Sequence, residues 1–225
     1  MDIQAGLFLL GTDTEVGKTF QAALLARHLV SCGWKVGVYK PVASGVIAAE
    51  KSDAEWLWEA SGRTVELARV CPQQFQAPLA PPVAAALEHR EVDEELLVSA
   101  ARWWRNRCDF LIVEGVGGAL SPLSSTMTAL DLALALQLPV AVVAANRLGA
   151  VNHILLTLEA IANRGLRTLG IVLNDLPRTD DTAGSSGENP AANHNQELLA
   201  RFTPIPIVHS AVQLPLGLSN PRATL

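Results

Sequence analysis

Cysteine is scarce in this sequence, and the cysteines that do occur are scattered. The chain has 225 residues and three cysteines, Cys32, Cys71 and Cys108, with no C-x-x-C pair among them. Three scattered cysteines without a C-x-x-C pair indicate neither a disulfide framework nor a zinc site. Reduced thiols of this kind are typical of cytoplasmic proteins, so we predict a cytoplasmic location.

Long apolar runs and an excess of basic residues are also lacking. Apolar runs such as Pro139–Ala145 are far shorter than the ~20 residues that span a bilayer. No basic segment follows Met1, so we expect no signal peptide. The 17 Lys and Arg residues face 22 Asp and Glu, a net charge of −5. Neither a nucleic acid nor a membrane surface is therefore an expected partner.

The sequence instead alternates short apolar runs with amphipathic stretches, and 49% of its residues are hydrophobic. The runs that predict strands are Gly6–Gly11, Lys35–Lys40, Phe110–Glu114, Val140–Ala144 and Leu169–Leu173. The stretches that predict helices are Lys18–Cys32, Asp93–Arg107, Ala129–Gln137 and Asn152–Arg164. Buried strands separated by helices imply an α/β fold with a mainly parallel sheet and helices on both faces. We predict one domain over residues 1–225, with a Pro-rich surface loop over Pro72–Pro82 and a mobile loop over 176–195.

A glycine-containing loop joins the first predicted strand to the first predicted helix. Gly11–Thr19 reads GTDTEVGKT, in which Gly17 allows close backbone approach and Lys18 can reach the β- and γ-phosphates of a nucleotide. The hydroxyl of Thr19 can bind Mg²⁺. The pattern G-x4-G-K-[ST] is not met strictly, because Thr12 stands at the first glycine position and Gly11 lies one residue earlier. The position between strand and helix still favours ATP binding and a phosphate-loop NTPase-like fold.

A second cation is expected from another strand. Some phosphate-loop proteins carry an extra lysine four residues before the second glycine, but this chain has Asp13 there, which argues against partition and septum-site ATPases. Lys40 ends the second predicted strand, within YKPVASG, and should lie at the same sheet edge as the phosphate loop. The alternative for Lys40 is a lysine that merely extends to solvent at a strand end.

Two acids are candidate magnesium ligands beside Thr19. Glu114 ends an apolar strand, where a buried charge needs a partner, and the glycines after it leave room for a ligand. Asp53 follows Ser52, and this pair alone is typical of a helix N-terminus. Asn174 and Asp175 end the last predicted strand. The amide of Asn174 can pair with an adenine edge, but Asn-Asp also favours an ordinary turn.

These motifs together resemble the dethiobiotin synthetase family. The segments that carry the resemblance are GTDTEVGKT, YKPVASG, Ser52–Ala54, VEGVGG at Val113–Gly118, Val151–His153 and Asn174–Asp175. They occur in the order, and close to the spacing, of that family from about Leu9 to Asp175. The resemblance implies a ligase that makes dethiobiotin from 7,8-diaminopelargonic acid, CO₂ and ATP with Mg²⁺. It also implies a carbamate, a carbamic–phosphoric anhydride, and a homodimer.

The resemblance implies a role for each matching residue. The catalytic residues would be Lys40, Lys18 and Thr14, and the metal residues Thr19, Asp53 and Glu114. The nucleotide would contact Glu15, Val16, Gly17, Lys18, Thr19, Phe20, Glu114, Gly115, Val116, Gly117, Asn174 and Asp175. The diamine would contact Ser44, Lys40 and Gly118, with Asn152 holding the substrate tail of the neighbouring subunit. Members of the family carry a tyrosine in the last helix, and Asn195 stands at the corresponding position here. The family's segment near the adenine corresponds to His209–Leu214 in this sequence.

Two other functions are weighed against this one. An amide ligase of the cobyrinic acid synthase type shares the fold, but it needs a glutamine-hydrolysing domain with a nucleophilic cysteine, for which no residues remain. A non-catalytic ATP-binding switch module has no need of a lysine such as Lys40 beside a substrate pocket.

Overall fold

The computed structural model describes residues 5–47, 50–176 and 190–218 of the chain. Most of the predicted loop 176–195 therefore lies outside the described residues. From Pro190 to Asn195, where we predicted the end of that loop, the chain instead forms the first part of helix α8, Pro190–Leu199.

A six-stranded sheet runs through the molecule in the order β2-β5-β1-β6-β7-β8, and each pair of neighbouring strands is parallel. Its strands are β1 (Gly6–Gly11), β2 (Val36–Tyr39), β5 (Phe110–Gly118), β6 (Val140–Ala145), β7 (Thr168–Asn174) and β8 (Ile207–Val208). The prediction of a mainly parallel α/β sheet is confirmed. The strand predicted over Phe110–Glu114 continues through the glycines to Gly118.

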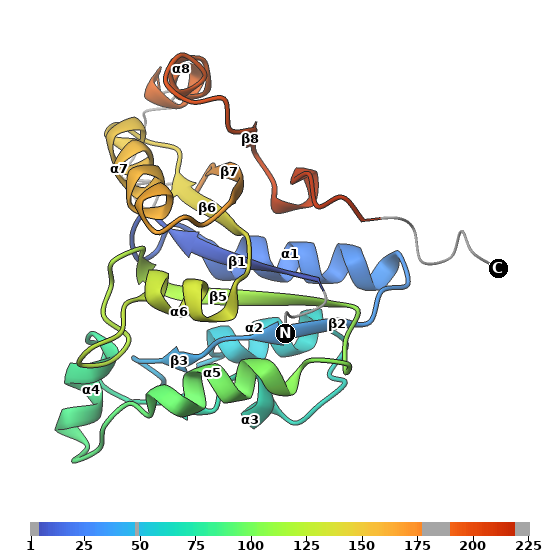
Figure 1. The fold of residues 1–225 in the computed structure, drawn as a ribbon, viewed down its shortest axis with the longest axis vertical. Coiled ribbons are helices and arrows are strands. Elements are labelled where there is room, and N and C mark those ends of the chain that lie inside the picture. Colours follow the sequence, from blue (N-terminus) through green and yellow to red (C-terminus); the bar gives the residue numbers. More distant parts are fainter. Residues whose placement is uncertain (1–4, 48–49, 177–189, 219–225) are drawn as a thin grey trace, which may run out of the picture.

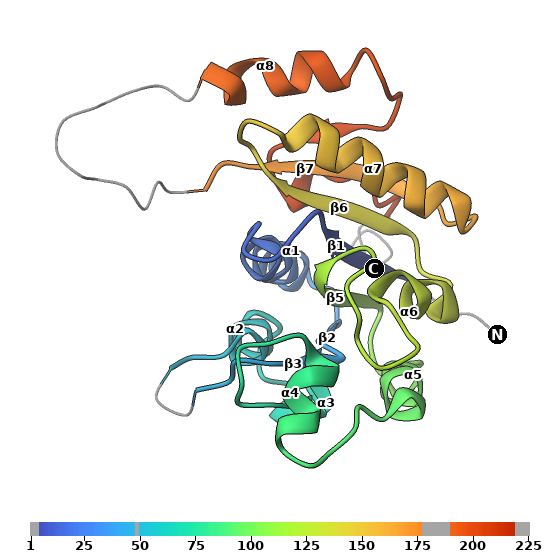
Figure 2. The ribbon, with the colours of Figure 1, turned by 90° about the vertical axis from the view of Figure 1, so that its left-hand side faces the viewer.

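Helices cover both faces of this sheet (Figure 1). Figure 2 shows α1 (Lys18–Ser31) and α2 (Asp53–Ala60) on one side, with α5 (Glu94–Trp103) and α6 (Ala129–Leu136) on the other. Helix α7 (Ala150–Asn163) packs against β6 and β7, and α8 packs against α7. The remaining helical turns are α3 (Leu67–Val70), α4 (Pro81–Leu87) and the 3₁₀ turn η1 (Ala211–Gln213). None of the helices in the described part of the chain is both long and apolar enough to cross a membrane.

The core lies between the helices and the central strands. Residues 7–10 of β1 and 140–143 of β6 are fully buried, which explains why these strands are apolar throughout instead of alternating. Gly37 in β2 leaves room for the neighbouring side chain of Trp104, because a Cβ there would lie 2.8 Å from its ring. Trp104 is thus a core residue, and its partner Trp103 is only partly buried.

Two predicted segments differ in extent from the structure. The helix predicted over Asp93–Arg107 is capped by Asp93 but ends at Trp103, because the chain turns through Asn106, with φ of 60°, to enter β5. The predicted Pro72–Pro82 loop contains strand β4 (Gln73–Gln74), which pairs with β3 (Val42–Ala43). It also starts α4, with Pro81 in the first turn, where its missing N–H costs no hydrogen bond.

Candidate active site

The phosphate loop joins β1 to α1 at the carboxyl edge of the sheet. Its backbone takes left-handed conformations at Glu15, with φ of 57°, and at Gly17, with φ of 86°. The ammonium group of Lys18 donates to the carbonyl of Asp13 at 2.8 Å. A Cβ on Gly11 would lie 2.7 Å from that ammonium nitrogen. Gly11 therefore makes room for the lysine, although it stands one residue before the usual glycine position.

Lys40 lies at the end of β2 and is paired with two carboxylates. Its Nζ donates to Oε1 of Glu114 at 2.7 Å and also to Oδ2 of Asp53. The hydroxyl of Thr19, in the first turn of α1, donates to the same Oε1 at 2.7 Å. Lys40 and Glu114 are buried, so Lys40 does not extend to solvent at its strand end. The tertiary fold brings together a phosphate-loop residue, a strand-end lysine and two acids.

The local sequence explains how Asp53 reaches Lys40. Ser52 accepts a hydrogen bond from the amide of Glu55, and Glu55 in turn accepts from the amide of Ser52, which forms a capping box at the start of α2. Asp53 is the first residue of that helix, so its carboxylate faces the lysine while Ser52 caps the backbone. The helix-start interpretation of this pair is correct, and it is also what positions the acid.

The charges of this cluster shift one another's pKa values. Burial lowers the pKa of Lys18 to about 8, with a contribution from the positive charge of Lys40, although Glu114 opposes the shift. Burial also disfavours the charged form of Lys40, but the carboxylates of Glu114 and Asp53 outweigh it and raise the pKa of that ammonium. Burial raises the pKa of Asp53, yet the charge of Lys40 and its hydrogen bond bring it below the ordinary value. Lys40 and Asp53 are therefore charged at neutral pH.

The residues predicted to hold Mg²⁺ fit such an ion. Oε2 of Glu114 is buried and has no hydrogen-bond partner among the described residues, so one carboxylate oxygen is available to a ligand. The hydroxyl of Thr19 and the half-exposed carboxylate of Asp53 lie beside it. Mg²⁺ usually binds through one or two carboxylates, waters and substrate phosphates. In the described chain, no group of three or more His, Cys, Asp or Glu residues forms a fuller cage.

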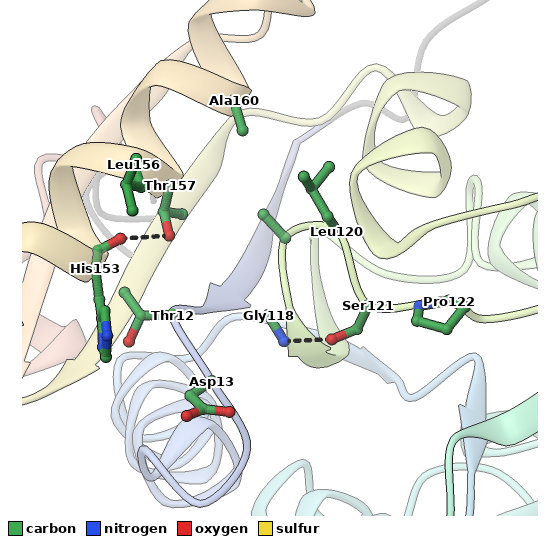
Figure 3. A pocket seen from close by; sticks show the side chains of 11 residues that line it. Thr12, Asp13, Gly118, Leu120, Ser121, Pro122, His153, Leu156, Thr157 and Ala160 are labelled. Atoms are coloured by element: carbon green, nitrogen blue, oxygen red, sulfur yellow. Dashed lines mark hydrogen bonds between the residues drawn. The ribbon is translucent and has the colours of Figure 1, made fainter.

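A cavity of about 550 Å³ opens between the phosphate loop and α7 (Figure 3). Asp13 and Gly118 line one side, and His153 and Leu156 line the other. Gly118 is thus found at this cavity, where its amide donates to Oγ of Ser121 at 2.8 Å. Asn152 precedes His153 in the first turn of α7 and is exposed. The helix begins at Ala150, two residues before the predicted start.

A larger cavity of about 930 Å³ contains most of the predicted site. Its walls include the following predicted residues: Thr14, Glu15, Gly17, Lys18, Thr19, Phe20, Lys40, Ser44, Asp53, Glu114, Gly115, Val116 and Gly117. The opposite wall is formed by residues 78–81 at the start of α4, which sequence reasoning assigned to a surface loop. Most of the predicted nucleotide residues and the predicted diamine residue Ser44 therefore face one common space.

Other predicted site residues lie behind the phosphate loop and not along this cavity. Val16 is buried, and its carbonyl accepts a hydrogen bond from Nδ2 of Asn174 at 2.9 Å. Oδ1 of Asn174 accepts from Gln21 at 2.8 Å, which leaves its amide one N–H and one lone pair for a further partner. Asp175 accepts a hydrogen bond from Asn146. Asn195 donates to Oδ1 of Asn146, so it ties α8 to the end of β6.

Two residues with a place in the site were missed by sequence reasoning. The hydroxyl of Ser121 holds the glycine turn after β5, and its position three residues after Gly118 could have indicated this. Gln21 carried no signal, because it lies in a helix that the pattern already explained and its partners are remote in the sequence.

Comparison with known proteins gives clear relatives. A family model described as an AAA domain matches residues 5–222. An ATP-dependent dethiobiotin synthetase BioD of Anaeromyxobacter dehalogenans is 48% identical over 198 residues, which is 88% of this chain and 85% of the relative. A protein of the same name from Rhodopirellula baltica is 38% identical over 221 residues, 92% of this chain and 83% of the relative.

Solved structures show the same fold at low identity. The pNOB8 ParA protein, solved bound to nonspecific DNA, is 13% identical with a TM-score of 0.54, covering 89% of this chain and 75% of that chain. The cell division protein FtsY of Thermotoga maritima is 18% identical with a TM-score of 0.51, covering 95% of this chain and 65% of that one. The prediction of a phosphate-loop NTPase-like fold is confirmed.

Proposed function

The chain belongs to the family of ATP-dependent dethiobiotin synthetases, and we propose that it closes the cyclic urea of dethiobiotin from 7,8-diaminopelargonic acid, CO₂ and ATP. The observation that carries this proposal is the placement of Lys40. It is buried between Glu114 and Asp53, in the same cavity as the phosphate loop. A generic ATPase needs the loop but has no use for a second lysine held at this point.

The proposed reaction begins with the diamine in the large cavity. One amine adds to CO₂ and loses a proton, giving a carbamate anion. A carbamate oxygen then attacks the γ-phosphorus of ATP, the bond to the ADP oxygen breaks, and a carbamic–phosphoric anhydride forms. The second amine attacks the carbonyl carbon, inorganic phosphate leaves with the bonding electron pair, and the amine loses its proton. The products are the cyclic urea, ADP and phosphate.

The side chains of this site suit the chemistry because two anions must approach each other. Carbamate and triphosphate repel, and preorganised cations offset that repulsion where charge develops. Lys18 would leave the carbonyl of Asp13 for the phosphates, and Lys40 would exchange a carboxylate partner for the carbamate. Thr14 lines the same cavity and would donate to the transferring phosphoryl group. Mg²⁺, held by Thr19, Asp53 and Glu114, would supply charge neutralisation of the phosphate oxygens.

The remaining contacts follow the walls of the two cavities. Ser44 and Gly117 line the large cavity and would bind the diamine end, and Gly118 would do so from the adjoining cavity. The free N–H and lone pair of the Asn174 amide match the N7 and N6 positions of adenine. Asp175, the next residue, would contact the nucleotide beside Asn174.

We propose a homodimer that places Asn152 near the substrate tail of the second subunit. Exposed leucines surround the smaller cavity: Leu120 is 60% exposed and Leu156 is 57% exposed. Leu148, just before α7, is 88% exposed. Exposed apolar side chains next to one cavity, as Leu120 and Leu156 are, favour contact with another protein surface. We place the reaction in the cytoplasm, where the three thiols stay reduced.

The test is direct product analysis. The protein is incubated with ATP, Mg²⁺, bicarbonate and 7,8-diaminopelargonic acid, and ADP, phosphate and the cyclic urea are quantified by mass spectrometry. We expect one urea per ADP, with Lys18→Ala reducing the rate by about 10²–10³ while the protein stays folded. Lys51→Ala, which removes an exposed ion pair with Glu59, is the matched control. ADP without the urea, or an amide product, would overturn the proposal.

A further inference from the structure

A chain of hydrogen bonds behind the phosphate loop joins three segments that are distant in sequence. The backbone amide of Ala211 donates to Oε1 of Gln21 at 2.9 Å. Nε2 of Gln21 donates to Oδ1 of Asn174 at 2.8 Å, and Nδ2 of Asn174 donates to the carbonyl of Val16 at 2.9 Å. We call these four groups the amide relay. All four residues are buried, so a hydrogen bond lost from the relay leaves a buried polar group without that partner.

The direction of the amide relay is fixed by its two ends. The backbone N–H of Ala211 can only donate, and the backbone carbonyl of Val16 can only accept. The side-chain oxygen of Gln21 must therefore face Ala211, and the side-chain nitrogen of Gln21 then faces Asn174. Oxygen of Asn174 then faces Gln21, and its nitrogen faces Val16. Each amide has one orientation that satisfies both neighbours, and reversing either one would oppose like groups in a buried place.

The relay ends in the part of the phosphate loop with the most demanding backbone. Val16 stands between Glu15 and Gly17, which both have positive φ values of 57° and 86°. A Cβ on Gly17 would lie 2.0 Å from Nδ2 of Asn174, so the Asn174 amide is pressed directly against the loop. A non-glycine residue such as Glu15 enters this conformation only when its surroundings hold it there.

We propose that Gln21 is a positioning residue of the phosphate loop: through Asn174 it holds the Val16 carbonyl, and with it the loop, in the binding conformation before nucleotide arrives. A loop that is ordered in advance loses less conformational entropy on binding. The proposal rests on the proposed ATP site, but it concerns triphosphate binding alone. The relay also couples the loop to η1, because the other end of Gln21 holds the amide of Ala211.

The test uses Gln21→Met, which keeps side-chain length and helix propensity but removes both hydrogen bonds. The probe is inorganic tripolyphosphate, which has no base or ribose, with ATP titrated in parallel by calorimetry. We expect both ligands to bind about tenfold more weakly, as follows from losing buried hydrogen bonds of ordinary strength. The matched control is Gln73→Met, since Gln73 is also buried and exchanges its two side-chain hydrogen bonds with the Asp93 backbone and not with the phosphate loop. Its tripolyphosphate affinity should stay within about twofold of the wild type.

A double-mutant cycle with Asn174→Leu locates the path of the effect. If Gln21 acts through Asn174, the double variant should bind tripolyphosphate no more weakly than Asn174→Leu alone. In steady state, Gln21→Met should raise KM for ATP and leave kcat within about twofold, because loop order contributes equally to the ground and transition states. Additive losses, a loss for ATP alone, or a lowered melting temperature with unchanged tripolyphosphate affinity would each overturn the proposal.

The wild-type protein provides a test that does not depend on a folded variant. Coupling between two sites is reciprocal, so tripolyphosphate bound at the loop should slow hydrogen exchange of the Ala211 amide at the far end of the relay. We expect slower exchange in a peptide covering 209–214, and unchanged exchange there would contradict the proposal. Because these readouts measure tripolyphosphate binding, they remain valid if no cyclic urea is formed, and failure of the proposed function is seen separately by product analysis.

Discussion

The ammonium nitrogen of Lys40 lies 2.7 Å from Oε1 of Glu114, the same oxygen that accepts the hydroxyl proton of Thr19 at 2.7 Å. One carboxylate oxygen thus accepts from the lysine that follows β2 and from a hydroxyl of the phosphate loop. The other oxygen is buried and has no hydrogen-bond partner in the part of the chain that the structure describes. A ligand that binds the free oxygen would compete for the charge that now holds Lys40. The charges of Lys40 and of the proposed magnesium ligands are therefore coupled through Glu114.

Replacing Lys40 should separate nucleotide binding from catalysis. In Lys40→Gln we expect ATP affinity within about threefold of the wild type, since Lys40 makes no direct hydrogen bond to the described residues of the phosphate loop. Both kcat and kcat/KM should fall by about 10²–10³, because the lysine acts where anionic charge develops. Calorimetry with ATP and steady-state kinetics in bicarbonate measure the two effects. Lys51→Gln serves as the control. Lost ATP binding with turnover retained at saturating ATP would mean that Lys40 clamps the nucleotide instead.

Replacing Glu114 should alter the magnesium requirement. Glu114→Gln keeps the shape of the side chain but removes the charge that a hard cation prefers. We expect the Mg²⁺ concentration for half-maximal activity to rise by about 10–100-fold. The control is Glu94→Gln, whose carboxylate accepts hydrogen bonds from Ser124 and Thr126 on another part of the surface. An unchanged Mg²⁺ titration in Glu114→Gln would show that Glu114 does not hold the proposed magnesium ion.

The lowered pKa of Lys18 predicts proton uptake when ATP binds. Without nucleotide its pKa is about 8, against 10.5 for an unperturbed lysine, and a bound triphosphate should raise it again. ATP affinity should therefore be constant below pH 8 and fall as pH rises above it, by up to about tenfold per unit. Calorimetry at pH 9 in two buffers of different ionisation enthalpy should show uptake of about one proton.

The same titration at pH 6.5 should show almost no proton uptake, because Lys18 is already charged there. In Lys18→Gln, the proton uptake at pH 9 that Lys18 causes should be lost. Equal uptake at both pH values would contradict the prediction.

The lowered pKa of Lys18 changes folding stability with pH in the opposite direction to ATP affinity. Between pH 8 and 10.5 the nucleotide-free protein binds fewer protons than the unfolded chain, so this lysine makes the free energy of unfolding rise with pH there.

The exposed leucines near α7 predict a self-association surface. Leu156→Asp places a charge on that surface and should shift the protein toward monomer in sedimentation velocity, with a raised KM for the diamine. Val30→Asp, at an exposed position of α1, should leave sedimentation unchanged. A wild-type protein that sediments only as a monomer at working concentration would contradict the proposed dimer.

The sequence by itself determined the fold class and the phosphate loop. Short unbroken apolar runs separated by helical stretches favour strands buried on both faces, and β1, β6 and β7 were placed within a residue or two on that basis. The loop was recognisable because its signal is local: a glycine, a lysine and a threonine at a junction between strand and helix. Lys40 and Glu114 could be predicted as site residues from their places at strand ends, because parallel strands bring their carboxyl ends to one edge of the sheet.

The tertiary structure alone decided which of these groups touch and what supports them. Whether Asp53 was only a helix-start residue or also a partner of Lys40 depended on how α2 packs beside β2, which no local pattern encodes. The amide relay is the extreme case. Gln21 lies 153 residues from Asn174 and 190 from Ala211, and a glutamine in a helix has the same local signature whether it faces water or a buried amide. Hydrogen bonds between remote residues form only once the chain is folded, so their geometry is a property of packing and not of sequence spacing.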